Sequence, residues 1–149
     1  MDQQLLHVAV RWVHVVAMAV ALGGAALVFM LALRGRRAGV PPAALVRVAV
    51  AYEWAFWAAA GTLVMTGIGN LGAFGAGLPS PQSGWGMTLV IKLSLVALLI
   101  ALSLPRTVAI GRLTDDATDR AVDLVRRLYG ATATALAVIA VLAVWLAHG

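Results

Sequence analysis

Ionisable side chains occur inside an apolar stretch near the N-terminus. His7, Arg11 and His14 lie in the segment HVAVRWVHVVAMAVALGG at spacings of four and three residues, and Met18 continues the series. These spacings return side chains to one face of an α-helix. A charged or titratable group in hydrocarbon costs roughly 2.5 kcal/mol or more, so such groups usually face a bundle interior, a cavity or a cofactor. The stripe therefore predicts a functional surface on the first helix.

Lys92 is a second ionisable residue in an apolar run, GWGMTLVIKLSLVALLIAL. At 1.5 Å rise per residue, Lys92 lies ~10 Å beyond Trp85, and His14 lies ~15 Å beyond the start of its helix. Both residues then belong to the same half of a membrane. A polar stripe with Thr88 and Ser103 indicates that Lys92 faces inward. The alternatives are a lysine that extends to the headgroups and a histidine that only bonds a neighbouring helix.

Haem is the first cofactor that this residue set suggests. A neutral imidazole is a good axial ligand for haem iron, and a lysine amine can serve once it is deprotonated, so His14 and Lys92 form a candidate ligand pair. His7 lies ~10 Å from His14 along the helix, so the two cannot ligate one iron. Arg11, one turn nearer the outer surface, is placed to pair with haem propionates.

Copper is the competing cofactor. His7 and His14 with the thioether of Met18, Met65 or Met87 would suit Cu(I). Methionine is also ordinary filler in apolar helices. Only His14 and Met18 are closely spaced on one face, and the sequence has no cysteine. We therefore place copper below haem, and keep a protein without cofactor, in which these side chains only form hydrogen bonds, as a third possibility.

The composition indicates the class of protein that must position these residues. The chain has 149 residues, 62% of them hydrophobic, and a net charge of +5, with a mean hydropathy of +0.96. Such a chain is too apolar for a soluble domain, and four apolar runs account for most of its length. The basic residues lie beside these runs, where lipid headgroups explain them better than nucleic acid does. We predict one all-α domain over residues 1–149, an integral membrane four-helix bundle.

The helix boundaries follow from proline, glycine and charge. We expect helices over about 5–33, 43–70, 85–104 and 115–147. Pro41 and Pro42 suit a first turn, and Pro105 predicts an end or a kink of the third helix. Asp115, Asp116 and Asp119 suit the positive end of the fourth helix. Small residues on that helix permit close contacts within one chain or in a homo-oligomer.

Orientation follows from the arginines. They flank the first and third loops, whereas the middle loop and both ends of the chain have none. Positive residues remain inside, so both termini should lie on the periplasmic side of a bacterial inner membrane. Trp85, Trp145 and His148 then lie near the outer interface.

Glu53 belongs to the inner half, because it follows Arg47 by only ~9 Å. We favour a structural pair with Tyr129 or with an arginine of the cytoplasmic loops over a role as a proton relay. Thr62, Thr66 and Asn70 form a polar ridge that is typical of hydrogen bonds between helices.

Three segments resemble known families. RWVHVVAMAVALGGAALVF resembles the first helix of the copper resistance protein D (CopD) family and of the related HemJ type of protoporphyrinogen oxidase, TLVMTGIGNL resembles the end of the second CopD helix, and GWGMTLVIKLSLVALLIAL resembles the lysine-bearing helix. In HemJ proteins the matching histidine and lysine are implicated in binding haem b, so the resemblance implies this role for His14 and Lys92. Ala21 replaces the usual tryptophan before the glycine pair, and LSLPRTVAIGR replaces the HemJ continuation.

The expected function is a redox role for a bound haem b in the outer half of the bundle. Its general form is electron transfer with a quinone or a partner protein, and its enzymatic form, implied by the HemJ resemblance, is oxidation of protoporphyrinogen. The resemblance to CopD implies copper uptake or tolerance as the alternative.

Overall fold

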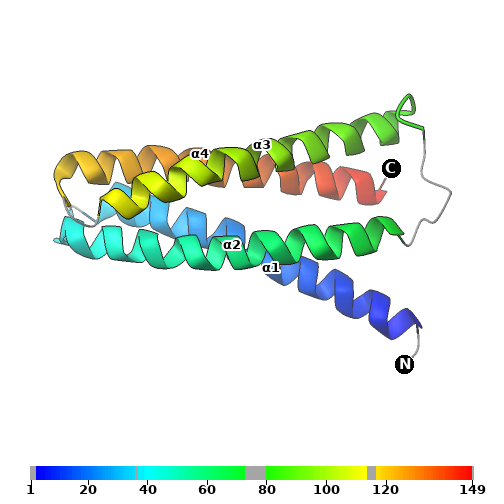
Figure 1. The fold of residues 1–149 in the computed structure, drawn as a ribbon, viewed down its shortest axis with the longest axis horizontal. Coiled ribbons are helices and arrows are strands. Elements are labelled where there is room, and N and C mark those ends of the chain that lie inside the picture. The colour runs from blue at the N-terminus through cyan, green and yellow to red at the C-terminus, as the bar shows by residue number, and fades with distance from the viewer. Residues whose placement is uncertain (1–2, 36, 73–79, 114–116, 149) are drawn as a thin grey trace.

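The protein is a bundle of four long antiparallel helices in a computed structural model that describes residues 3–35, 37–72, 80–113 and 117–148 (Figure 1). The helices are α1 (Gln3–Arg34), α2 (Pro42–Gly72), α3 (Gly84–Arg112) and α4 (Asp119–His148). Each helix is long and apolar enough to cross a membrane. The prediction of an all-α bundle whose four helices could each span a membrane is therefore confirmed.

Local residue chemistry sets where the helices begin and end. Pro42 occupies the first turn of α2, where its missing N–H costs nothing. Gly39 has a φ of 72°, a conformation that glycine adopts without strain in the turn before α2. Ser83 caps α3, because its hydroxyl oxygen accepts a hydrogen bond from the backbone N–H of Gly86 at 3.0 Å.

Two predicted boundaries differ from the structure. The third helix, for which Pro105 predicted an end or a kink, continues through Pro105 to Arg112. The residues that follow Pro105 are bonded to α2 and α4, and these contacts hold the helix together where proline removes one backbone bond. The fourth helix begins at Asp119, whereas about Asp115, which lies outside the described residues, was predicted. Thr118 directly precedes the helix and is not helical, and threonine is a favoured residue at this capping position.

The bundle has an up-down-up-down order. α1 packs against α2 and α4, α3 packs against α4 and α2, and α1 and α3 lie diagonally across the bundle. Both ends of the chain lie at one end of the bundle, and the α1–α2 turn lies at the other (Figure 1). We call the half nearer the chain ends the terminal half, and the half nearer the α1–α2 turn the basic half.

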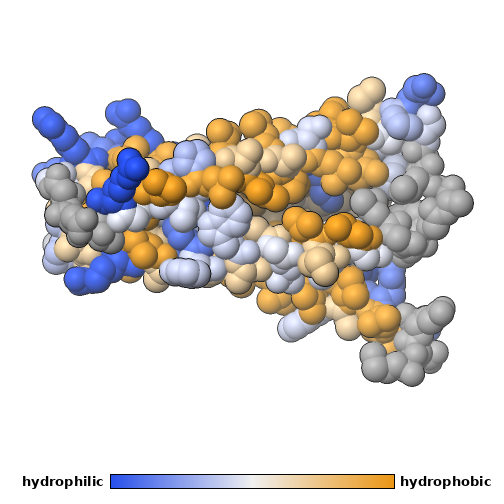
Figure 2. Space-filling view, viewed as in Figure 1, coloured by the Kyte–Doolittle hydropathy of each residue, from blue (hydrophilic) through white to orange (hydrophobic). Residues whose placement is uncertain are grey.

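Figure 2 shows how polarity divides along the bundle. Hydrophilic side chains gather at the end with the α1–α2 turn, and apolar side chains cover the middle of the face formed by α2 and α3. This division is the one expected for a chain whose arginines flank an apolar belt.

The core lies mainly in the basic half. The largest fully buried side chains lie in this half or at the middle of the bundle, and they are Tyr129, Phe56, Ile110, Val28, Val46, Val125 and Ser103. The ring of Tyr52 packs directly against Gly24, where a side chain would collide with it, since a Cβ at Gly24 would lie 2.2 Å from Cε2 of that ring. The hydroxyl of Tyr52 donates to the carbonyl oxygen of Ala21, so this contact fastens α1 to α2.

Candidate functional site

His14 is fixed against α2 by a hydrogen bond. Its Nδ1 lies 2.7 Å from Oγ1 of Thr66. The Thr66 hydroxyl has one hydrogen, and it donates this to the carbonyl oxygen of Thr62 at 2.6 Å. Oγ1 therefore accepts from Nδ1–H, which assigns the tautomer of the neutral imidazole. The lone pair of Nε2 remains for another partner, and among the described residues Nε2 makes no hydrogen bond.

The ring of His14 also lies close to the α2 backbone. A Cβ at Gly67 would lie 3.8 Å from Cε1 of the imidazole. The predicted ridge on α2 thus supplies one contact to α1 through Thr66. Thr62 instead donates to Ala58 within its own helix, and the side chain of Asn70 lies outside the described residues.

Lys92 lies on α3, diagonally across the bundle from α1 and His14. Its side chain is half-buried, and it belongs to the same half of the bundle as His14. Lys92 makes no hydrogen bond and no ion pair within the described part of the chain. The inward orientation of Lys92 stays a prediction, and its amine has no partner among the described residues.

The other predicted residues on α1 lie around His14 rather than at one point. Arg11 is exposed, and His7 is half-buried one turn closer to the chain end. Met18 is half-buried and packs against the hydrophobic core. Within the described residues, no group of three or more histidine, cysteine, aspartate or glutamate side chains could hold a metal ion.

The terminal half is sparsely packed around His14 and Lys92. No residue of α1 from Gln4 to Val16, and none of α3 from Met87 to Leu102, is buried. Native cores are normally filled to high density by buried side chains. The helices in this half are therefore not held together by large buried side chains of α1 and α3, as they are in the basic half.

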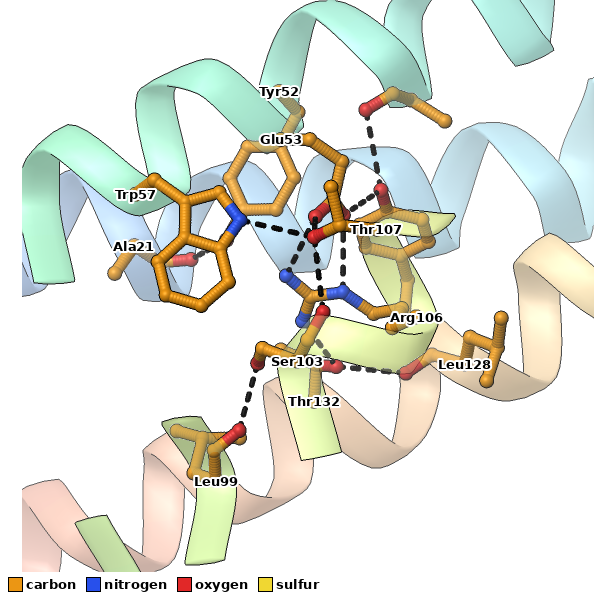
Figure 3. A network of polar contacts seen from close by, with 12 residues as sticks. Ala21, Tyr52, Glu53, Trp57, Leu99, Ser103, Arg106, Thr107, Leu128 and Thr132 are labelled. Carbon is orange, nitrogen blue, oxygen red and sulfur yellow. Dashed lines mark hydrogen bonds and ion pairs between the residues drawn. The ribbon is translucent and has the colours of Figure 1, made fainter. Parts of the chain in front are cut away.

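The basic half contains a polar network around Glu53 (Figure 3). Arg106 donates from Nε to Oε1 of Glu53 at 2.9 Å and from Nη2 to Oε2 at 3.1 Å, which makes a bidentate pair. Tyr129 donates to Oε1 at 2.5 Å, and the hydroxyl of Thr107 contacts Oε2. Nη1 of Arg106 donates to Thr132 at 2.8 Å. The predicted bond between Glu53 and Tyr129 is confirmed, and an arginine bonds Glu53 as well, although Arg106 lies within helix α3 and not in a loop.

Aromatic rings enclose this ion pair. The guanidinium carbon of Arg106 lies 4.3 Å from the ring centroid of Phe56 and 5.4 Å from that of Tyr129. Both charged residues are only 4% exposed. The sequence analysis did not assign Thr107 and Thr132 to this cluster, although Ser103, Arg106 and Thr107 share one helix face by their spacing. A buried and fully bonded pair is suited to holding three helices together.

The tryptophans near the chain ends have structural partners. Nε1 of Trp85 donates to the backbone carbonyl of Leu146 at 3.1 Å and links α3 to α4. Trp145 is 70% exposed, as expected for a ring at a membrane interface. The side chain of His148 lies outside the described residues.

No model of a protein family matches the chain, and neither a curated protein nor a solved structure shows a significant match to it. The resemblance to the CopD and HemJ families therefore stays a prediction from the short motifs.

Proposed function

We propose that this chain is a haem b-binding membrane protein with a redox role, in which His14 and Lys92 ligate the iron in the terminal half of the bundle. The bond from Nδ1–H of His14 to Thr66 carries the proposal. Histidine ligands almost always donate their second ring N–H to a nearby acceptor, which orients the ring and raises its basicity. His14 has this arrangement, with Nε2 left for the metal.

The surrounding residues fit a haem group. Lys92 supplies an amine without a partner among the described residues, and the sparse packing of the terminal half leaves α1 and α3 free of large buried side chains. Arg11 is the exposed cation for the propionates, and His7 adds a polar group at the same end. A haem b held there would supply reversible one-electron transfer.

The distribution of arginines supports the orientation of the chain. With positive residues inside, the basic half faces the cytoplasm and the terminal half faces the periplasm of a bacterial inner membrane. The haem site would lie in the outer half, within reach of a quinone or a redox partner protein. Oxidation of protoporphyrinogen is the enzymatic form that the HemJ resemblance supports.

An absorption spectrum tests the cofactor. Protein purified in detergent from haem-sufficient cells should show a Soret band in oxidised and reduced samples, with near-stoichiometric iron. His14→Ala should abolish the band, whereas Val13→Ala, which alters an exposed neighbour, should retain it. A colourless protein would contradict the haem proposal. Bound copper in that sample would favour copper transport, and neither metal would favour a scaffold.

Lys92→Met tests the second ligand. If Lys92 ligates the iron, this change should leave haem on His14 alone and shift the spectrum towards that of a five-coordinate iron. Leu93→Met is the matched control, because it also introduces a methionine, at the neighbouring exposed position. An unchanged spectrum in Lys92→Met would remove Lys92 from the ligand set and leave His14 in it.

A further inference from the structure

An apolar groove opens between α2 and α3 in the basic half, whereas the haem ligands proposed above belong to the terminal half. Its volume is about 240 Å³. The groove is lined by residues of both helices, and these are Val50, Glu53, Trp54, Trp57, Thr107, Ile110 and Gly111. Trp54 is 80% exposed. Because the surrounding surface belongs to helices that can cross a membrane, the groove opens towards lipid.

Apart from the indole N–H of the exposed Trp54, the polar side-chain atoms of the lining are already in use. Oε1 of Glu53 accepts from Arg106 and Tyr129, and Oε2 accepts from Arg106 and Thr107. Four donors match the roughly four acceptor positions of a carboxylate. Nε1 of Trp57 donates to Thr107 at 2.9 Å. The groove therefore offers little to a polar ring such as a quinone head, and it suits an apolar chain.

The size of the groove supports the same class of ligand. Pockets for drug-sized molecules usually measure about 300–1,000 Å³. A groove of about 240 Å³ is smaller. It accommodates a segment of a hydrocarbon chain better than a whole ring-bearing molecule.

Arg47 lies at the end of this groove that faces the cytoplasm in the proposed orientation. At 100° per residue, Arg47, Val50, Trp54 and Trp57 share an arc of about 80° on α2. Arg47 is exposed and makes no ion pair or hydrogen bond with any described residue. Helical side chains point towards the helix N-terminus, so Arg47 extends to the basic end, where lipid phosphates lie. Its charge complements an anionic headgroup.

We propose that the groove between α2 and α3 binds an acyl chain of an anionic phospholipid whose phosphate lies on Arg47. Gly111 keeps the groove open on the α3 side. A Cβ at Gly111 would meet nothing within 4 Å, so a larger side chain there can fill the groove without a clash at its first atom.

Lipid titration followed by native mass spectrometry of the full chain in detergent tests this site. Phosphatidylglycerol should bind about fivefold more tightly than phosphatidylcholine of the same chain length, the preference expected from one arginine. Gly111→Leu should weaken both lipids by about tenfold, the loss expected when about two methylene groups no longer fit. Arg47→Gln should remove the preference, because it weakens phosphatidylglycerol more than zwitterionic phosphatidylcholine.

Gly23→Leu is the matched control, because Gly23 is exposed on α1 and also has nothing within 4 Å of an added Cβ. It should bind both lipids as the unmodified chain does. Equal binding by Gly111→Leu and the unmodified chain, or a preference that survives Arg47→Gln, would overturn the proposal. Displacement of phosphatidylglycerol by an isoprenoid quinone of similar chain length would also overturn it. None of these measurements depends on bound haem.

Discussion

The basic half and the terminal half of this bundle hold ionisable groups in opposite ways. In the basic half, Glu53 and Arg106 form a bidentate pair, and hydroxyl groups from α3 and α4 complete their hydrogen bonds. In the terminal half, His14 has one ring nitrogen bonded, and Lys92 has no hydrogen-bond partner among the described residues.

This difference predicts which substitutions act on the stability of the bundle and which act on the proposed haem site. Buried charge that is fully paired holds helices in one arrangement, and removing one partner is costly. An ionisable side chain in an apolar segment costs free energy, and at His14 and Lys92 a bound ligand could offset that cost. We therefore expect substitutions in the basic half to act on folding, and those in the terminal half to act on binding of the proposed haem.

The largest expected effect is on the ion pair. Arg106→Met leaves the Glu53 carboxylate buried without its cation, which should lower the free energy of unfolding by about 3–5 kcal/mol. Unfolding with sodium dodecyl sulfate in mixed micelles, followed by circular dichroism, measures this. Arg112→Met changes an exposed arginine of the same helix and should cost less than about 0.5 kcal/mol. Equal costs for the two variants would show that the network does not stabilise the basic half.

A smaller effect is expected where α1 meets α2. Gly24→Ala places a methyl group 2.2 Å from the ring of Tyr52, so it should lower the free energy of unfolding by about 1–3 kcal/mol. Gly23→Ala makes the same change at the adjacent position, where nothing lies within 4 Å. It should be neutral or stabilising, because alanine favours helix. A Gly24→Ala protein as stable as Gly23→Ala would mean that Tyr52 moves without cost.

The smallest effect on stability is expected in the terminal half. Thr66→Val removes the acceptor of the His14 N–H and should cost about 1 kcal/mol of unfolding free energy. If His14 ligates haem, the same change should weaken haem binding by roughly 10–100-fold, as loss of an orienting partner does. Haem titration of the apoprotein measures the affinity.

Thr134→Val is the control for this experiment. Its hydroxyl is exposed and donates only to Gly130 in its own helix, at 2.9 Å. It should leave haem affinity unchanged. Equal haem affinity in the two threonine variants would contradict the assigned role of Thr66.

Much of the fold was predictable from the sequence, because hydropathy and proline act locally. The four apolar runs predicted four helices, and Pro42 marked the start of α2. The end of α3 was not predictable, since Pro105 normally interrupts a helix, and only bonds from Arg106 and Thr107 to other helices show why it continues.

The candidate residues were predictable by type, but of their partners only Tyr129 was named in advance. His14, Lys92 and Glu53 were identified because ionisable groups are costly in apolar segments. The pairing of Glu53 with Tyr129 followed from their similar height in the membrane. Thr66 was identified only as part of a ridge, because the rotation of α2 about its axis decides which threonine meets His14.

The sequence by itself determined that this chain has four helices of membrane-spanning length, with all arginines but Arg11 towards one end and titratable residues along its helices. These properties depend on composition and on spacings within one helix. The tertiary structure decided which arginine pairs with Glu53, which nitrogen of His14 stays free and where a groove opens between α2 and α3. Those outcomes depend on the rotation and offset of helices joined by contacts between distant residues, such as Glu53 and Arg106, 53 positions apart.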